Sequence, residues 1–461
     1  MTRKLRESTT SAEWPLVNPN AAGLDIGSAE IWVCVPAERD PQPVRAFGTF
    51  TPDLQALATW LKACAIETVA MESTGVYWIP AYELLEDQGF TVCLVNARHL
   101  KHVPGRKSDI QDCQWIQRLH SFGLLNASFR PAAEMCALRA YLRHRATLIE
   151  HRAAHIQHMQ KALQQMNVQL SQVLKDITGV TGQAIIRAIV AGERDPVQLA
   201  QLRDPRCANS TATIAKALTG NYRAEHLFAL KQALALYDFY TAQLQECDGE
   251  IERQFSVLRP VHEDDNLPPL DTSDKRDTHS KNAPAYDARS LLYQLLGVDL
   301  VAINGLNAST VQTIIAEIGT DMSRWPSVKH FCAWLGLAPR NDISGGKVLR
   351  SRTAKTRNRA GQSFRLAAQS VGRTQTALGA FFRRLRAKHG APKAIVATAH
   401  KLARIFFFML KHRTPFHDIG AAAYDERERQ HEITRLKKRA AKLGLMLVEP
   451  PAPPPGVQVS G

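Results

Sequence analysis

Segments typical of strands and helices alternate near the N-terminus, and this alternation constrains the fold more than any other feature of the chain. Residues 21–36 read AAGLDIGSAEIWVCVP, a β-rich run interrupted at Gly27 that predicts a hairpin. Residues 53–64 and 77–88 have apolar side chains at helical spacing. Residues 68–71 and 90–95 are short apolar runs typical of buried strands. Strands that alternate with helices predict an α/β domain.

Most of the remaining chain has a helical pattern. Residues 108–125 carry apolar side chains on one helical face, and residues 132–166 and 224–255 have heptad-like apolar spacing. This spacing fits either a helical hairpin that forms a short coiled coil or plain bundle helices. Another helical region begins at Leu291.

Polar, proline-bearing stretches separate these regions. Residues 258–284 predict a flexible linker, and residues 449–461 (EPPAPPPGVQVSG) predict a disordered tail. We therefore expect an α/β plus α protein. Its expected segments are an α/β domain, a helical or coiled-coil region, a linker, a helical C-terminal domain, and a basic helix with a tail: 15–130, 131–257, 258–288, 289–420 and 421–461.

Basic residues are concentrated in one part of the chain. The 461 residues have a formal net charge of +15. Residues 340–415 contain 18 Lys and Arg but one acid, Asp342, so this segment is +17 and the remainder is −2. A contiguous cationic segment predicts a polyanionic partner, most often a nucleic acid. The alternative is a solvated helical surface, although such surfaces normally mix both signs of charge.

Cysteine usage and apolar runs narrow the class of protein further. The eight cysteines include no Cys-x-x-Cys pair and no zinc-like His/Cys spacing, which is typical of reduced thiols in a cytosolic protein. The first 14 residues lack the apolar segment of a signal peptide, and the apolar runs are far shorter than the ~20 residues that span a bilayer. We therefore expect a cytoplasmic protein without a membrane partner.

Four carboxylates occupy positions that suit metal binding. Asp25 lies in the first strand, Glu72 ends a buried strand, and Asp109 and Asp112 share one face of a helix. Carboxylates at strand ends and on a helix turn converge in open α/β sheets, and Mg²⁺ prefers oxygen ligands of this kind. Two such ions about 4 Å apart support phosphoryl transfer. Taken singly, each acid also fits a turn or a solvated helix face.

A serine stands beside two glycines at the start of the basic segment. Residues 331–347 read FCAWLGLAPRNDISGGK, in which Ser344 precedes Gly345 and Gly346. A flexible turn of this kind lets a hydroxyl approach a phosphate, but the hydroxyl is a weak nucleophile unless a metal, a base or a positive field activates it. The alternative is an ordinary loop serine before a DNA-binding helix.

Further residues predict contacts with nucleic-acid phosphates. Residues 302–319 resemble a helix-hairpin-helix motif with its turn at Gly305, where backbone amides can bind a phosphate, and a structural helical hairpin is the alternative. The residues that we expect to contact nucleic acid are Arg106, Lys107, Gly305, Arg340, Lys347, Arg350, Arg352, Lys355, Arg357, Arg359 and Arg365.

Two sets of motifs in this order resemble one protein family. GLDIGS around Asp25, AMESTG around Glu72 and the segment RKSDIQDCQW resemble the RuvC-like DEDD domain of the insertion-sequence 110 family of transposases. The Gly305 turn, WLGLAPR and ISGG resemble the second transposase domain of that family. The resemblance covers most of residues 21–130 and 291–415.

The chain departs from the family pattern at two places. Asn304 precedes the turn glycine where the family typically has proline, and residues 178–284 are longer than in compact members. The longer region either extends a dimerising coiled coil or contacts RNA.

The resemblance implies a fold and an activity. The fold would be an RNase H-like domain, a helical or coiled-coil middle and a small helical transposase domain. The activity would be strand exchange between donor and target DNA during transposition, guided by a noncoding bridge RNA. Family members act as oligomers, so we expect a homodimer or homotetramer whose sites join domains from different protomers.

The resemblance also implies roles for five residues. Asp25, Glu72, Asp109 and Asp112 match the metal-binding and catalytic acids of the family, with Mg²⁺ as the cofactor or Mn²⁺ in its place. Ser344 matches the nucleophile that forms a covalent phosphoserine–DNA intermediate.

Two other functions remain open at this point. A RuvC-like nuclease, such as a junction resolvase, would need the four acids but not Ser344. A non-catalytic nucleic-acid-binding protein would need neither the acids nor the serine.

Overall fold

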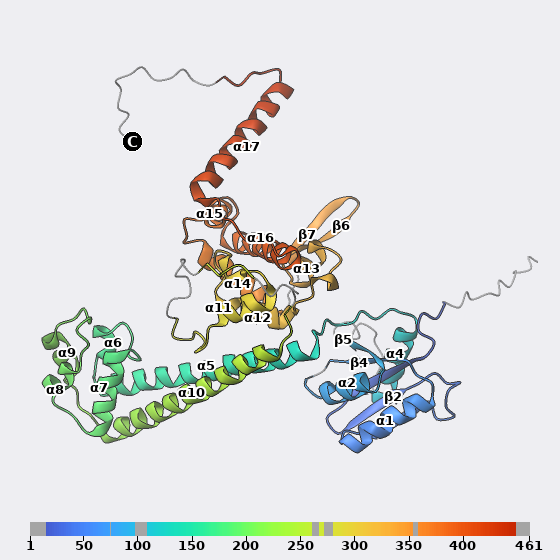
Figure 1. The fold of residues 1–461 in the computed structure, drawn as a ribbon, viewed down its shortest axis with the longest axis horizontal. Helices are drawn as coiled ribbons and strands as arrows, with labels where there is room; N and C mark the ends of the chain where they lie inside the picture. The colour runs from blue at the N-terminus through green and yellow to red at the C-terminus, as the bar shows by residue number, and fades with distance from the viewer. Residues whose placement is uncertain are drawn as a thin grey trace, which may run out of the picture. The chain divides into compact units, whose positions relative to one another are not determined.

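The protein is described here by a computed structural model that covers residues 15–73, 75–96, 108–260, 267–271, 280–353 and 358–448. The chain divides into two units, Met1–Arg130 and Pro131–Gly461 (Figure 1). We call them the N-terminal and the C-terminal unit. Within the described ranges, no helix is long and apolar enough to cross a membrane.

The N-terminal unit is built on a mixed five-stranded sheet with strand order β3-β2-β1-β4-β5. The first three strands form an antiparallel meander, and β4 and β5 run parallel to β1. The strands are β1 (Ala21–Ile26), β2 (Glu30–Cys34), β3 (Val44–Gly48), β4 (Thr68–Glu72) and β5 (Thr91–Val95). This mixed sheet confirms the α/β prediction and has the RNase H-like arrangement that the resemblance implies.

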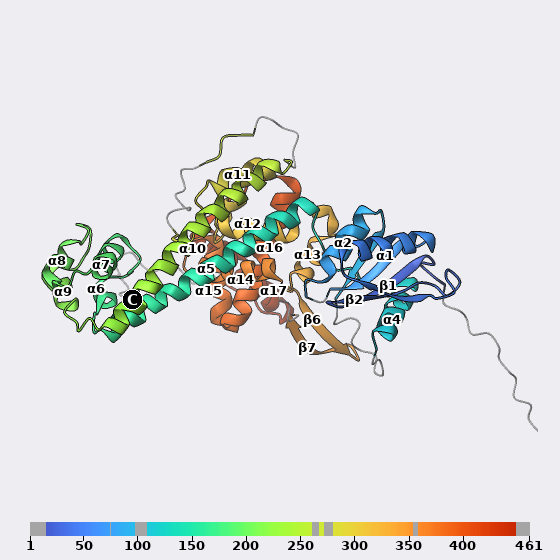
Figure 2. The same cartoon turned by 90° about the horizontal axis from the view of Figure 1, so that it is seen from below.

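Helices cover both faces of this sheet, as Figure 2 shows. They are α1 (Thr51–Ala63), α2 (Trp78–Asp87) and α4 (Asp109–Ser121). The larger core lies between the sheet and α1 and α2, whereas Ile116 of α4 packs with Ala70 and Val95 on the other face. Because both faces are covered, β1 is almost continuously apolar, as sequence patterns of buried strands require.

The sequence did not reveal β3. This strand reads VRAFG, and none of its residues is fully buried. It lies at one edge of the sheet, where a strand needs neither a long apolar run nor strict alternation.

A long antiparallel helical hairpin begins the C-terminal unit. It consists of α5 (Ala133–Gln165) and α10 (Ala224–Val257), in agreement with the two predicted long helices. Tyr141 lies beside Cys247, and His151 stacks on Tyr240, so the two helices run in opposite directions.

Along the chain, four short helices connect α5 to α10: α6 (Leu170–Val173), α7 (Val180–Ala191), α8 (Pro196–Gln201) and α9 (Thr211–Ala217). Ile185, Leu199 and Ile214 are fully buried in a core that they share with both long helices. Figure 1 shows this small domain at the far end of the hairpin. Much of the region from 178 to 284 is therefore folded structure that closes the hairpin.

The remaining C-terminal unit is helical except for one β-hairpin. Its elements are α11 (Ala288–Leu296), η1 (Leu300–Ala302), α12 (Ala308–Ile318), η2 (Met322–Arg324), α13 (Val328–Trp334), β6 (Pro339–Ser344), β7 (Lys347–Thr353), α14 (Arg359–Val371), α15 (Ala377–His389), α16 (Ala391–His412) and α17 (Gly420–Lys442). The core forms around α16, where Phe406 meets Phe364 and Phe407 meets Phe331.

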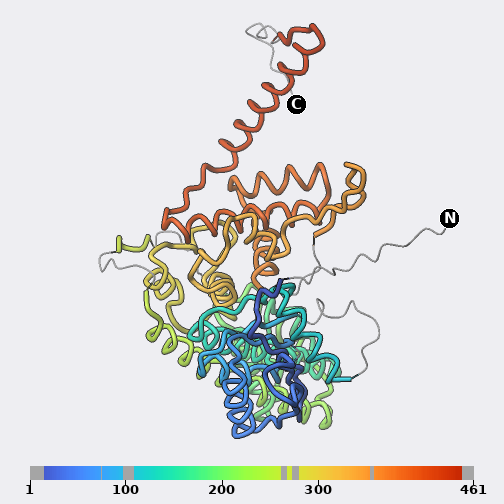
Figure 3. The backbone as a smooth tube through the Cα atoms, turned by 90° about the vertical axis from the view of Figure 1, so that its right-hand side faces the viewer, coloured from blue at the N-terminus to red at the C-terminus, as the bar shows by residue number. Residues whose placement is uncertain are grey.

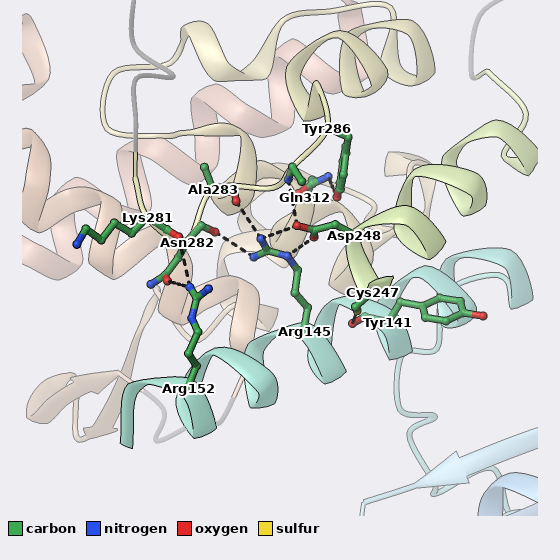
Figure 4. Close-up of polar contacts among 11 residues, drawn as sticks. Tyr141, Arg145, Arg152, Cys247, Asp248, Lys281, Asn282, Ala283, Tyr286 and Gln312 are labelled. Atoms are coloured by element: carbon green, nitrogen blue, oxygen red, sulfur yellow. Dashed lines mark hydrogen bonds and ion pairs between the residues drawn. The ribbon is translucent and has the colours of Figure 1, made fainter. Parts of the chain in front are cut away.

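The segment that leads into α11 is held against the helical hairpin (Figure 4). Arg145 of α5 forms a buried ion pair with Asp248 of α10 and donates hydrogen bonds to the carbonyl oxygens of Asn282 and Ala283, both at 3.1 Å. Asp248 also accepts a hydrogen bond from the Ala285 amide at 3.0 Å. Residues 280–287, inside the range predicted as a linker, are thus ordered by a buried charge pair.

Candidate active site

Two of the four predicted acids lie at one edge of the sheet. Leu24 of β1 and Met71 of β4 are partners in the register of these two parallel strands. Asp25 comes directly after Leu24, and Glu72 comes directly after Met71. Carboxyl ends of parallel strands share an edge, so the two carboxylates are neighbours there. Both side chains are half-buried.

Helix α4 brings the other two acids to the same edge. Asp109 and Asp112 lie in its first turn, which begins after Ser108, whose hydroxyl caps the helix by accepting a hydrogen bond from the Gln111 amide. The positive end of the helix dipole favours carboxylates at this position.

Close approach of α4 to β1 depends on a glycine. A Cβ atom on Gly23 would lie 2.2 Å from the Gln117 amide nitrogen and 2.4 Å from the Cys113 carbonyl oxygen, both in the α4 backbone. No side chain larger than hydrogen fits there, and a backbone clash cannot be relieved by a rotamer change. Gly23 was not predicted to matter, although a glycine inside a buried strand signals close backbone approach.

The surroundings of Asp25 disfavour its negative charge. The pKa of Asp25 is raised to about 6, first by burial and then by the negative charges of Asp112, Asp109 and Glu72. We call these four residues the carboxylate edge. The structure therefore places the other three predicted acids within electrostatic range of Asp25.

The carboxylate edge fits a divalent cation. All its donors are hard oxygens, and a cation would offset the repulsion that raises the pKa of Asp25. No three His, Cys, Asp or Glu side chains in the described ranges are already gathered as ligands of one ion. Arg106 and Lys107, predicted to hold phosphate nearby, lie outside the described residues.

The predicted serine lies at the tip of a β-hairpin. Strands β6 and β7 are antiparallel, and Ser344 pairs with Lys347 across the two-residue turn of Gly345 and Gly346. These glycines have φ values of +55° and +74°, a left-handed conformation that favours residues without a Cβ. The expected flexible turn is thus a tight hairpin turn. We call residues 339–353 the serine hairpin.

Pairing places all four cations of the serine hairpin on one face. Ser344, Asp342 and Arg340 alternate along β6 and therefore point to the same side. Their partners across the ladder are Lys347, Arg350 and Arg352, whose side chains share that side.

A β-bulge makes this arrangement possible. Lys347 and Arg350 are three residues apart, so a regular strand would direct them to opposite faces. The register shifts between Asp342 and Ile343, which leaves Leu349 without a partner in the ladder and restores the common face.

Other predicted nucleic-acid contacts have varied surroundings. Arg359 is exposed at the start of α14, whereas Arg365 is partly buried and donates a hydrogen bond to the Gly336 carbonyl oxygen at 2.7 Å. Arg365 therefore joins α14 to the end of α13. Lys355 and Arg357 lie outside the described residues.

Packing constrains Gly305, and its phosphate contact stays a prediction. It has a φ of +90°, and a Cβ there would lie 2.2 Å from Val371 Cγ2 and 2.9 Å from the Ala367 carbonyl oxygen. The turn before α12 consequently packs directly on α14.

The fold and the carboxylate edge define a class of protein, the metal-dependent enzymes that carry out phosphoryl transfer with an RNase H-like domain. Two sequence profiles identify the family. Residues 22–168 match the DEDD transposase domain of IS110 type, and residues 299–383 match the profile described as "Transposase IS116/IS110/IS902 family". A comparison with curated proteins gives no significant match.

The chain belongs to the IS110 family of transposases. The first matched range contains the carboxylate edge, and the second contains Ser344. The protein is therefore a DNA-binding phosphoryl-transfer enzyme that uses a divalent metal, which excludes the non-catalytic alternative.

Proposed function

We propose that this transposase exchanges DNA strands through a covalent phosphoserine intermediate, with Ser344 as the nucleophile. The geometry of the serine hairpin supports this proposal. The hairpin presents a hydroxyl at an exposed tip, on the same face as Lys347, Arg350 and Arg352. The two glycines of the turn leave the approach to the hydroxyl free of side chains.

The proposed reaction transfers one phosphoryl group twice. Ser344 Oγ attacks a phosphorus of the DNA backbone, the Oγ–P bond forms, and the bond to one bridging sugar oxygen breaks. The departing oxygen takes up a proton as the serine loses one. A hydroxyl from another DNA strand then attacks the same phosphorus and releases the serine, so no external energy source is needed.

Neighbouring cations assist the nucleophile. The Lys347 ammonium opposite Ser344 favours the ionised hydroxyl and attracts the phosphate, and Arg350 and Arg352 bind adjacent phosphates. Asp342 is the one acid paired on this face, and its partner in the ladder is Arg350.

We assign the metal to the carboxylate edge, with Asp25, Glu72, Asp109 and Asp112 as its protein ligands and Mg²⁺ as the ion. When bound, the ion supplies Lewis-acid stabilisation of the charge that develops on the phosphate oxygens. The four carboxylates would hold the ion, and two of them, Asp109 and Asp112, lie at the positive end of the α4 helix dipole, which favours negative charge there.

Membership of this family also suggests the nucleic-acid and protein partners. We propose donor and target DNA as substrates, a noncoding bridge RNA as the guide that selects them, and a homodimer or homotetramer as the active form. Pairing with a guide RNA would set sequence specificity, because the predicted protein contacts are chiefly to phosphates.

A covalent-trapping experiment tests the serine mechanism. Wild-type protein with Mg²⁺, end-labelled DNA and its RNA should yield a labelled protein–DNA adduct that survives denaturation. Ser344→Ala should abolish both the adduct and recombination. Ser351→Ala is the matched control, because Ser351 pairs with Asn341 on the other face of the same hairpin.

Recombination by Ser344→Ala at a normal rate would overturn the serine mechanism. DNA cleavage without an adduct would favour a RuvC-like nuclease. For the guide, the protein should be purified from cells that carry its native flanking DNA, and the bound RNA sequenced. Absence of one specific RNA would contradict guidance.

A further inference from the structure

Helix α17 is anchored at its base only. Tyr424 is buried against α15, where its ring meets Phe381 and its hydroxyl accepts a hydrogen bond from Arg384 at 2.9 Å. Arg384 also pairs with Glu428 at 2.5 Å, and the Lys401 ammonium lies 5.3 Å from the centre of the Tyr424 ring. These contacts fix the direction in which the helix leaves α15 (Figures 1 and 3).

The outer half of α17 projects from this base. None of residues 430–442 is buried, although all are helical. At 1.5 Å per residue this segment is about 20 Å long. An isolated helix of this length is marginal in water, so its sequence should reflect a binding role more than packing.

Charge is distributed unevenly along the helix. The inner half mixes both signs: Arg427 and Arg429 alternate with three acids, and Arg429 pairs with Glu426. Glu432 is the last acid before the end of the described chain at Val448. Five cations follow it.

Four of these cations share one face. Arg435, Lys438, Arg439 and Lys442 are spaced at i, i+3, i+4 and i+7, which places them on a single side of a helix. Arg435 pairs with Glu432, whereas the other three make no ion pair within the described part of the chain. Glu428 lies seven residues before Arg435, and Tyr424 lies four residues before Glu428, so both are on the same side of α17 as these cations. The cationic face is therefore on the side of the helix that packs on α15.

We propose that the outer half of α17 is an arm that binds the phosphate backbone of double-stranded DNA. DNA is the polyanion that a transposase must hold, and the arm presents a row of cations over a length comparable to several phosphates. The arm lies outside both ranges that match the family profiles, so it adds a contact to those of the family domains. The inference does not depend on the role of Ser344.

The narrow apolar face of the arm favours DNA over a membrane surface. Within residues 430–442 the apolar stripe consists of Ile433, Leu436 and Ala440, and it lies away from the cationic face. The exposed apolar residues of 443–448 lie beyond the end of the helix. An interfacial helix would need a broader apolar face with bulkier side chains.

Salt dependence of DNA binding tests the arm. Each phosphate contact contributes about 0.9 to the slope of log K against log salt concentration for duplex DNA. Lys438→Gln/Lys442→Gln should therefore bind a short random duplex with a slope shallower by about 1.8. Between 50 and 200 mM salt, wild type should lose about twelvefold more affinity than this variant.

A matched variant removes the same charge from the inner half of α17. Arg427→Gln/Arg429→Gln should leave the slope close to that of wild type, and circular dichroism should show equal helicity for all three proteins. Equal slopes for wild type and Lys438→Gln/Lys442→Gln would overturn the proposal, as would an equal loss in the inner-half variant. A loss confined to single-stranded RNA or to anionic vesicles would also overturn it.

Discussion

The carboxylate edge and the serine hairpin are held in place by different forces. Asp25 and Glu72 follow Leu24 and Met71, which are fully buried, and α4 packs directly against β1 at Gly23. Every residue of β6, and nearly every residue of β7, is exposed, so backbone pairing and two glycines hold Ser344. Changes at the carboxylate edge should therefore alter both stability and activity, whereas changes in the serine hairpin should alter activity alone.

The largest expected effect is at Asp25. Asp25→Asn should lower recombination at least a thousandfold, because it removes a proposed metal ligand. The same change should stabilise the metal-free protein by about 1 to 2 kcal/mol at pH 8, since it removes a half-buried charge that three carboxylates repel. Thermal unfolding in EDTA checks this, and Mg²⁺ should raise the melting temperature of wild type more than that of the variant.

The stabilisation that Asp25→Asn provides should depend on pH. A carboxyl group whose pKa is raised in the folded protein destabilises the fold when ionised, so the cost is full above about pH 6 and absent below its ordinary pKa of 3.8. The advantage of Asp25→Asn should therefore fade as the pH is lowered from 8 to 4. An advantage that persists at pH 4 would contradict the electrostatic cause.

Gly23→Ala should be the most destabilising of these changes. Its Cβ would meet the α4 backbone at 2.2 Å, so α4 must move, at a cost of about 1–3 kcal/mol. Asp109 and Asp112 move with the helix, and recombination should fall as well. Chemical denaturation measures the stability change. Gly249→Ala on α10 is the control, because nothing lies within 4 Å of its Cβ and it should not destabilise.

The turn of the serine hairpin should respond in activity alone. Gly346→Val forces a β-branched residue to a φ of +74°, which disfavours the tight turn and should reduce adduct formation about tenfold. The melting temperature should stay within a degree of wild type. Gly345→Asn should retain most activity, because asparagine tolerates this conformation in hairpin turns. Equal loss in both variants would argue against a turn-geometry effect.

The smallest expected effect distinguishes the two faces of the hairpin. Arg352→Gln should make the salt dependence of DNA binding shallower by about 0.9, with unchanged stability. Ser351→Gln, on the opposite face, should leave the slope unchanged. Equal slopes for all three proteins would show that this face does not contact DNA.

Local patterns predicted much of the fold. Apolar runs gave β1, β4 and β5, and helical spacing gave α1, α2, α5 and α10, because these elements bury regular faces. Strand β3 and the strands of the serine hairpin were not predicted. An edge strand and an exposed hairpin bury little apolar surface, so their sequences show no apolar pattern. The four acids were found by their positions at strand ends and on one helix turn.

The sequence by itself determined which residues we propose for the chemistry and where the charges lie: four acids in the N-terminal unit, and a serine within a cationic segment of the C-terminal unit. Tertiary structure alone decided how residues within each unit are placed beside one another. Gly23 sets how closely α4 approaches β1, because a backbone contact between distant residues leaves no periodic pattern in either segment. The unpaired Leu349 brings Lys347 and Arg350 to the face of Ser344, because register depends on pairing with another strand and not on spacing along one.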